Sequence, residues 1–166
     1  MAITKEKKGE IVAKLTGIFA KAPSAAFVQF GKLTVAQANI LRRTLKEKGV
    51  GYYVAKKTLI RRALEGTKLA GDVPTLHGEV AVAYAVNAGD TLAPVREVSV
   101  FTKKFDKAVE IIGGIFEGRF VGQAEAFALS LIPSRETLLA QFANIVNSPL
   151  QRLVVGLGEV AKIKKS

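Results

Sequence analysis

The order in which two kinds of apolar pattern follow one another constrains the fold of this chain most strongly. Up to residue 131, stretches with apolar residues at helical spacing alternate with short runs of apolar and β-branched residues that are typical of strands. Beyond residue 131 only helical spacing remains. The alternation predicts one α/β (α+β) domain with a mixed sheet of roughly four to five strands flanked by helices, followed by a helical C-terminal appendage.

Turn and capping residues place the expected elements along the chain. Helices are predicted at residues 4–21, 35–48, 58–65, 90–105, 123–131, 134–146 and 148–165. Strands are predicted at residues 25–30, 50–55, 79–86, 109–112 and 115–121, the last two joined by a tight turn at Gly113-Gly114. The change of pattern at Ile132-Pro133-Ser134 predicts a boundary, with residues 1–131 forming the domain and residues 132–166 the appendage.

The composition excludes several classes of chemistry. The chain has no cysteine and a single histidine, His77, so it can form neither a disulfide nor the usual nitrogen and sulfur metal sites. No nucleophile stands in a pattern with a base, and residues 31–34 (Gly-Lys-Leu-Thr) lack the earlier glycine of a phosphate-binding loop. We therefore expect no catalytic residues, no metal, no cofactor and no small-molecule substrate.

The expected location follows from the absence of targeting and membrane signals. The first residues lack the apolar stretch of a secretory signal. The longest apolar run, residues 80–86, is too short to span a bilayer. We expect a cytoplasmic protein that does not associate with a membrane.

The positive charge is concentrated in the first part of the chain. Residues 42–68 contain nine lysine and arginine residues against two glutamates, and the first 68 residues carry as much net charge as the whole chain, +11. Pairs of like charge, Arg42 with Lys46 and Lys57 with Arg61, stand four residues apart. Such pairs destabilise an isolated helix by a few tenths of a kcal/mol each, and a bound polyanion would remove that cost.

This concentration of charge favours nucleic acid over the alternative of a merely solvated basic face. The candidate nucleic-acid-binding residues, which the resemblance given below makes candidates for RNA binding, are Arg42, Arg43, Lys46, Lys56, Lys57, Arg61 and Arg62. Tyr52 and Tyr53 lie between the two groups and are expected on opposite faces of a strand. One of the two tyrosines could stack on an unpaired base, although packing in the core is the favoured interpretation.

The last predicted helix, residues 148–165, has a narrow apolar face. Ser148 is the expected N-cap and Pro149 fits the first turn. The apolar face consists of Leu150, Leu153, Val154, Leu157, Val160 and Ala161. Ile163 extends this face, which then has six large aliphatic side chains. Burying them is worth about 9–18 kcal/mol as an upper bound, so the face must pack on something. Its own domain, a membrane surface and another protein are the three options, and the completeness of the preceding domain favours another protein.

Four blocks of sequence, taken together, resemble a known family. They are residues 31–35 leading into 41–45, residues 54–63 (Val-Ala-Lys-Lys-Thr-Leu-Ile-Arg-Arg-Ala), residues 113–118 (Gly-Gly-Ile-Phe-Glu-Gly) and residues 131–136 (Leu-Ile-Pro-Ser-Arg-Glu). In this order and at this spacing they are similar to the bacterial family of large-subunit ribosomal protein ten (uL10), the base of the ribosomal stalk. The similarity extends over nearly the whole chain.

The resemblance implies a function that fits the charge and the apolar face. It implies that residues 1–131 bind large-subunit rRNA beside a neighbouring stalk-base ribosomal protein. It also implies that the C-terminal helix binds dimers of the acidic stalk protein, whose mobile domains recruit translational GTPases. The matching positions make Lys56, Arg61 and Arg62 the first candidates for RNA contacts, followed by Arg42 and Arg43.

Two departures from the family and two other functions remain open at this stage. Lys57 stands where the family usually has asparagine, so the N-cap of that helix is expected to move to Thr58 or to be lost. The short last helix, with Gly156 and Gly158, favours one or two bound dimers over three. The alternatives are a free RNA-binding regulator, acting on messenger RNA, whose helix folds back on its own domain, and a phosphate-ester enzyme, which lacks a metal or nucleophile set.

Overall fold

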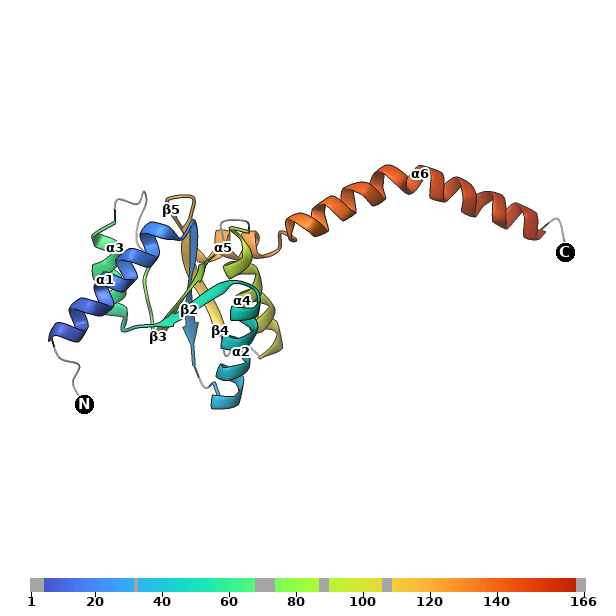
Figure 1. Ribbon diagram of the computed structural model, residues 1–166. Coiled ribbons are helices and arrows are strands. Elements are labelled where there is room, and N and C mark those ends of the chain that lie inside the picture. Colours follow the sequence, from blue (N-terminus) through green and yellow to red (C-terminus); the bar gives the residue numbers. More distant parts are fainter. Residues whose placement is uncertain (1–4, 32, 68–73, 87–89, 106–108, 164–166) are drawn as a thin grey trace. The chain divides into compact units, whose positions relative to one another are not determined.

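The computed structural model describes residues 5–31, 33–67, 74–86, 90–105 and 109–163, apart from the side chain of Lys5 and a few side chains near the C-terminus. The chain divides into two compact units, Met1–Ile132 and Pro133–Ser166. The first unit is an α+β domain and the second is helical, so the fold class expected from the sequence is confirmed (Figure 1).

The first unit is built on one five-stranded sheet. Its elements are α1 (Lys5–Lys21), β1 (Ser24–Phe30), α2 (Val35–Glu47), β2 (Val50–Val54), α3 (Lys57–Glu65), β3 (Glu79–Ala85), α4 (Ala93–Lys104), β4 (Val109–Phe116), β5 (Arg119–Val121) and α5 (Gln123–Ser130). The strand order is β2-β3-β1-β4-β5. This order makes β2 an edge strand whose one sheet partner among the described strands is β3.

The expectation of a mixed sheet was wrong in one respect, because every pairing between the described strands is antiparallel. The helix α2 connects β1 to β2, which run parallel to each other but are not neighbours. The strand β3 lies between them and pairs with both. The helix α4 connects β3 to β4 in the same way across β1. In each of these two split β-α-β units, the strand inserted between the two parallel strands is antiparallel to both, so all neighbouring strands are antiparallel.

Helices cover both faces of the sheet. Successive residues of β1 alternate between the two faces, with Phe27 in one core and Val28 in the other. The Phe27 core is closed by α1 and α3, and the Val28 core by α2, α4 and α5 (Figure 1). The domain therefore has three layers, and α2 and α3 lie on opposite sides of the sheet.

The strand β4 is continuous where the sequence predicted a tight turn. Gly113 and Gly114 lie inside this strand, and β5 follows a turn at Glu117 and Gly118, both at positive φ. A Cβ atom on Gly114 would lie 2.6 Å from the carbonyl oxygen of Ala25 on the neighbouring strand. The two glycines thus serve a close approach between backbones, near the register shift that β4 makes against β1.

The second unit contains one long helix, α6 (Arg135–Ile163), where two helices were expected. Ser134 caps its start, because its hydroxyl oxygen accepts a hydrogen bond from the backbone nitrogen of Thr137 at 3.3 Å. Pro149 lies inside the helix, although the sequence placed it at the start of a second one. A proline inside a helix removes one backbone hydrogen bond and bends the axis without ending it, and α6 bends about half-way along its length (Figure 1).

Candidate nucleic-acid interface

The helix α2 presents one group of the candidate cations. The helix begins with a capping box, in which Thr34 and Gln37 satisfy each other's backbone nitrogens at 3.3 and 3.0 Å. Leu41 and Leu45 are buried against the sheet, and the chain turns at Gly49, where φ is 69°. The three cations on α2 follow these leucines by one or two places in the sequence, so they face outward.

The side chains of Arg42, Arg43 and Lys46 are all exposed. The Nε atom of Arg43 lies 3.0 Å from a Glu47 carboxylate oxygen, but both side chains are more than 60% exposed, so this pair adds little stability and leaves the arginine free to exchange partners. Arg42 and Lys46 have no ion-pair partner within the described part of the chain. All three cations are therefore accessible to phosphate groups.

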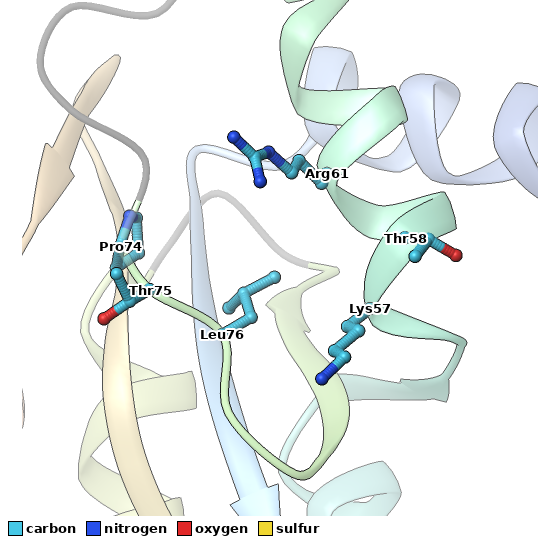
Figure 2. Close-up of a pocket in the computed structure, with 6 residues that line it drawn as sticks. All are labelled: Lys57, Thr58, Arg61, Pro74, Thr75 and Leu76. Carbon is cyan, nitrogen blue, oxygen red and sulfur yellow. The ribbon is translucent and has the colours of Figure 1, made fainter.

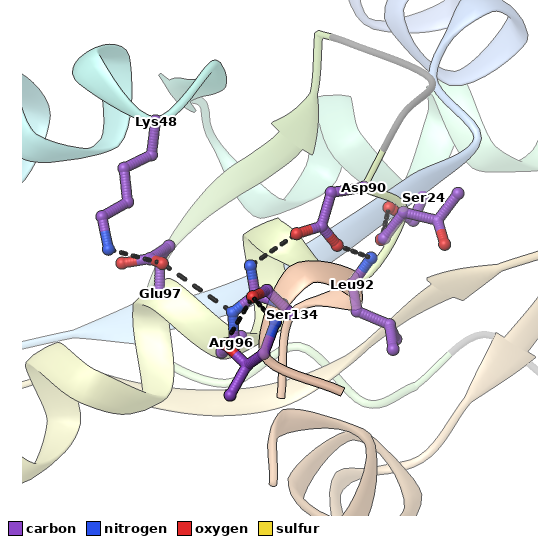
Figure 3. Close-up of polar contacts among 9 residues, drawn as sticks. Ser24, Lys48, Asp90, Leu92, Arg96, Glu97 and Ser134 are labelled. Carbon is purple, nitrogen blue, oxygen red and sulfur yellow. Dashed lines mark hydrogen bonds and ion pairs between the residues drawn. The ribbon is translucent and has the colours of Figure 1, made fainter. Parts of the chain in front are cut away.

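Lys48, at the end of α2, has a different role. Its Nζ atom lies 2.8 Å from a carboxylate oxygen of Glu97 on α4, and the Glu97 side chain is only 6% exposed (Figure 3). Arg96 adds a contact to Glu97 at 3.9 Å and binds Asp90 at 2.5 Å. These charges link the end of α2 to the start of α4, and they hold the cation-bearing helix in place on the sheet.

The helix α3 presents the second group of cations. Leu59, Ile60, Ala63 and Leu64 are buried and fix which side of the helix faces the core. The remaining positions carry the exposed cations Lys57, Arg61 and Arg62, and exposed Lys56 precedes them. Arg61 lies 3.5 Å from Glu65, again as an exposed pair that contributes little.

The N-terminus of α3 has no side-chain cap. Lys56 occupies the N-cap position, and no side-chain hydrogen bond is made there. Of the two outcomes expected from the replacement of asparagine by Lys57, the structure shows the loss of the cap. Unsatisfied backbone nitrogens and the partial positive charge of the helix end therefore coincide with two lysines, an arrangement that suits a phosphate.

A hollow of about 320 Å³ lies beside this helix. Lys57 and Arg61 project from the same side of α3 toward the segment containing Pro74 and Leu76, which forms the opposite wall (Figure 2). Among the described residues that line it, two carry a positive charge and none a negative one. An anionic group entering this hollow would meet both cations at once.

The two cationic groups flank the edge of the sheet. The chain passes directly from α2 through β2 to α3, and the two helices cover opposite faces (Figure 1). The five residues of β2 span about 17 Å. The sequence identified the seven cations but could not show that the sheet separates them into two groups joined by its edge strand.

The two tyrosines of β2 point to opposite faces, as expected. Tyr52 packs against the core under α2, where burial raises its pKa to about 12 despite the opposing effect of the nearby Arg42 charge. Tyr52 therefore stays neutral and serves as a core residue. Tyr53 packs on the other core, under α1 and α3, and is partly exposed.

The apolar positions of α6 form a second candidate surface. Leu153, Val154, Leu157 and Val160 are each 61–68% exposed, while the side chains of Leu150 and Ala161 lie outside the described residues. Unit two contains no second described helix that could cover them.

The earlier half of this surface was not predicted from the sequence. The additional exposed apolar residues are Leu138, Leu139, Phe142, Ile145 and Val146. Leu138, Phe142 and Ile145 recur at spacings of four and three, and a continuous helix places them on the same side as Leu153 and Val160. The spacing was visible in the sequence, but the assumed break at Pro149 separated the two halves.

The described residues hold no group of three or more histidine, cysteine, aspartate or glutamate side chains that could bind a metal ion. None of the helices within the described ranges is long and apolar enough to cross a membrane.

Comparison with known proteins decides the family. Residues 3–103, from α1 to α4, match the sequence profile of ribosomal protein L10. The chain belongs to the ribosomal protein L10 family. This family consists of structural ribosomal proteins and not of enzymes, so the resemblance to large-subunit ribosomal protein ten and the expectation of a non-catalytic protein are confirmed.

Individual L10 relatives match beyond the profile. The large ribosomal subunit protein uL10 of Shouchella clausii is 35% identical over 96% of this chain and 95% of its own length. The uL10 proteins of Koribacter versatilis and Bacillus cereus are 36% and 32% identical over 93% and 99% of this chain, and over 83% and 98% of their own lengths. The similarity to L10 proteins therefore includes α6 as well as the sheet domain.

Proposed function

We propose that this L10-family chain forms the base of the stalk on the large ribosomal subunit in the cytoplasm. Its first unit binds large-subunit rRNA, and α6 binds dimers of the acidic stalk protein, which supports the recruitment of translation factors. The observation that carries the proposal is the separation of two unlike surfaces in one chain. Exposed cations flank the edge of the sheet in the first unit, and exposed apolar residues run along the helix of the second.

The RNA-binding part rests on charge and accessibility. The proposed contacts are Arg42, Arg43, Lys46, Lys56, Lys57, Arg61 and Arg62. Their charges are exposed, and the two that form ion pairs do so with exposed glutamates that a phosphate can displace. Two separated groups suit a folded RNA, whose backbone can pass both sides of the edge strand β2.

The docking part rests on the apolar face of α6. The residues first proposed are Leu150, Leu153, Val154, Leu157, Val160 and Ala161, and we extend the surface to Leu138, Phe142 and Ile145. An amphipathic helix that offers such a row of anchors is a common binding element for other helices. Residues 132–166 contain five lysine and arginine residues against two glutamates, a net charge of +3, which favours an acidic partner.

A neighbouring ribosomal protein completes the proposed set of partners. The side of the domain that carries α4 and α5 has apolar side chains suited to such a contact. Phe127 on α5 is 53% exposed, and it borders a hollow of about 390 Å³ that Ile111 and Lys103 also line. This surface lies away from α1 and α3, which cover the other face of the sheet.

A pull-down at two salt concentrations tests the whole proposal. The tagged full chain is incubated with a large-subunit rRNA transcript and the acidic stalk protein, and the complex is washed at low and at high salt. We expect high salt to release the RNA, because phosphate contacts depend on counterion release, while the stalk protein stays bound through apolar contacts. Failure of either partner to bind at low salt, or release of both together at high salt, would contradict the proposal.

A further inference from the structure

A second hollow, outside the two cationic groups, lies between α1 and the β2–β3 edge of the sheet. Its volume is about 530 Å³, within the range of ligand sites in proteins. The lining residues that matter here are Lys14, Gly17 and Lys21 of α1, Tyr53 of β2, Tyr84 of β3, and Val86. None of the described residues that line it is acidic.

Two tyrosine rings form the sheet side of this hollow. Tyr53 and Tyr84 come from neighbouring strands and belong to the same face, since both pack on the core under α1 and α3. Tyr84 is paired with Gly51, and a Cβ atom at Gly51 would lie 2.3 Å from the Cζ atom of the Tyr84 ring. The ring therefore lies across the backbone of β2, in a position that only a glycine at residue 51 permits. Both tyrosines are partly exposed.

The helix side of the hollow supplies positive charge and open space. Lys14 and Lys21 stand seven residues apart on α1, which places them two turns apart on the same side of the helix. Gly17 lies between them, and a Cβ atom there would meet no atom within 4 Å. The absence of a side chain at residue 17 keeps the space between the two lysines free.

We propose that this hollow binds an unpaired nucleotide of the rRNA, with the base on the Tyr53 and Tyr84 rings and a flanking phosphate on Lys14 or Lys21. The inference rests on the proposed rRNA-binding function and adds a site to it. Aromatic rings that stack bases, bordered by cations that bind the backbone, are the recurring means by which proteins hold single-stranded RNA. The site is continuous with the proposed RNA surface, because Tyr53 belongs to the strand that joins the two cationic groups.

The test fills the hollow and leaves the side chains of the folded protein in place. The variant Gly17→Leu puts a side chain in the open space, and leucine also favours the helix more than glycine does. The matched control is Gly9→Leu in the same helix. A Cβ atom at Gly9 also meets nothing within 4 Å, and Gly9 does not line the hollow. Both variants are expected to fold.

The readout is photo-crosslinking of the full chain to a large-subunit rRNA transcript that contains 4-thiouridine, followed by peptide mapping. We expect crosslinks at Tyr53 or Tyr84 in the wild type and in Gly9→Leu, and their loss in Gly17→Leu. The affinity of Gly17→Leu for the RNA should fall by roughly five- to a hundredfold, the usual contribution of one stacked base. Unchanged crosslinks and affinity in Gly17→Leu would overturn the inference, as would crosslinks that avoid both tyrosines.

A second pair of variants separates this inference from the proposed function. Lys14→Gln with Lys21→Gln should lower the slope of log affinity against log salt by about 0.7 for each lysine that binds a phosphate in the wild type. If Arg61→Glu with Arg62→Glu releases the RNA while every variant in the hollow binds normally, the proposed function stands and this site is wrong. If the wild type itself does not bind the transcript, the proposed function fails first. If the hollow binds a side chain of another protein instead of a nucleotide, the variants in the hollow will bind RNA as the wild type does. That result would also refute the site.

Discussion

At the scale of single residues, the same type of ion pair has different importance in two places. Lys48 pairs with Glu97, whose side chain is 6% exposed, whereas Arg43 pairs with Glu47 in solvent. A buried carboxylate that loses its partner keeps its desolvation cost, while an exposed carboxylate is rehydrated. The sequence shows nine cations in residues 42–68, but only the structure shows that one of them, Lys48, links two helices.

The pair of variants Lys48→Met and Arg43→Met tests this difference. We expect Lys48→Met to lower the free energy of unfolding by about 1–3 kcal/mol, because among the described residues Glu97 then keeps only the longer contact with Arg96. Arg43→Met should change it by less than about 1 kcal/mol. Urea unfolding followed by circular dichroism measures both. Equal losses of stability in the two variants would show that Glu97 does not depend on Lys48.

Gly114 provides a second test at this scale. The sequence predicted a turn at this residue, but it lies inside the strand β4. Gly114→Ala places a Cβ atom 2.6 Å from the carbonyl oxygen of Ala25, so the two strands must separate, at an expected cost of about 1–3 kcal/mol. Gly122→Ala is the control, since a Cβ atom there meets nothing within 4 Å. Thermal unfolding compares the two, and a Gly114→Ala protein as stable as the control would mean that the strands tolerate the shift.

At the scale of helices and strands, the sequence predicted the existence of most elements but not their partners. Local apolar spacing and the capping residues were sufficient for α2, because Thr34 and Gln37 act within the same turn. The insertion of β3 between β1 and β2 depends on contacts between residues far apart in the sequence. Local patterns carry no information on such contacts, so the sheet was expected to be mixed.

The two helix predictions that failed have local physical reasons. Pro149 satisfies the usual rule for a helix start, yet it lies inside α6, because a helix tolerates proline when the remaining backbone hydrogen bonds continue on both sides. The start of α4 was expected at residue 90, and the helix begins at Ala93. The Asp90 carboxylate instead accepts a hydrogen bond from the backbone nitrogen of Leu92 at 3.2 Å, which forms a turn ahead of the helix.

The helix α3 carries the prediction that tests the RNA surface directly. Arg61→Glu with Arg62→Glu reverses two exposed charges of α3, and Arg61 lines the same hollow as Lys57. We expect weaker rRNA binding and a salt slope that falls by about two, since two arginines no longer bind phosphates. Filter binding over a range of salt concentrations measures both quantities.

The control for α3 is a charge reversal on another helix. Lys103→Glu with Lys104→Glu changes the net charge equally at the end of α4, on the opposite side of the sheet. This variant should bind rRNA somewhat more weakly, because the protein is less basic. Its slope of log affinity against log salt should stay that of the wild type, because the specific phosphate contacts remain. An identical response of the two variants would mean that the effect is one of net charge and that α3 has no special role.

At the scale of the whole molecule, the sequence shows directly how charge and apolar residues are distributed along the chain. Both are properties of long segments and survive errors in the boundaries of single elements. The family followed from ordered blocks and was then confirmed by comparison. The extent of the partner surface did not follow, because it depended on whether α6 is one helix or two.

Two truncations of α6 test how far that surface extends. Deletion of residues 148–166 removes the apolar positions proposed from the sequence but leaves Leu138, Phe142 and Ile145. We expect this chain to bind fewer stalk-protein dimers than the full chain, and we expect deletion of residues 135–166 to abolish binding. Both should retain rRNA binding, because the sheet domain keeps its own core. Native mass spectrometry counts the dimers on each chain.

The outcome distinguishes three arrangements of the molecule. If deletion of residues 148–166 alone abolishes binding, the earlier half of α6 is not a docking surface, and its exposed side chains need another partner. If both truncations lose rRNA together with the stalk protein, the two units do not act independently. If hydrogen exchange shows that the face with Phe142 and Leu153 is protected in the free, monomeric protein, the helix packs on its own chain. Burial of that kind would support a free regulator over a docking helix, because no apolar surface would remain for the dimers.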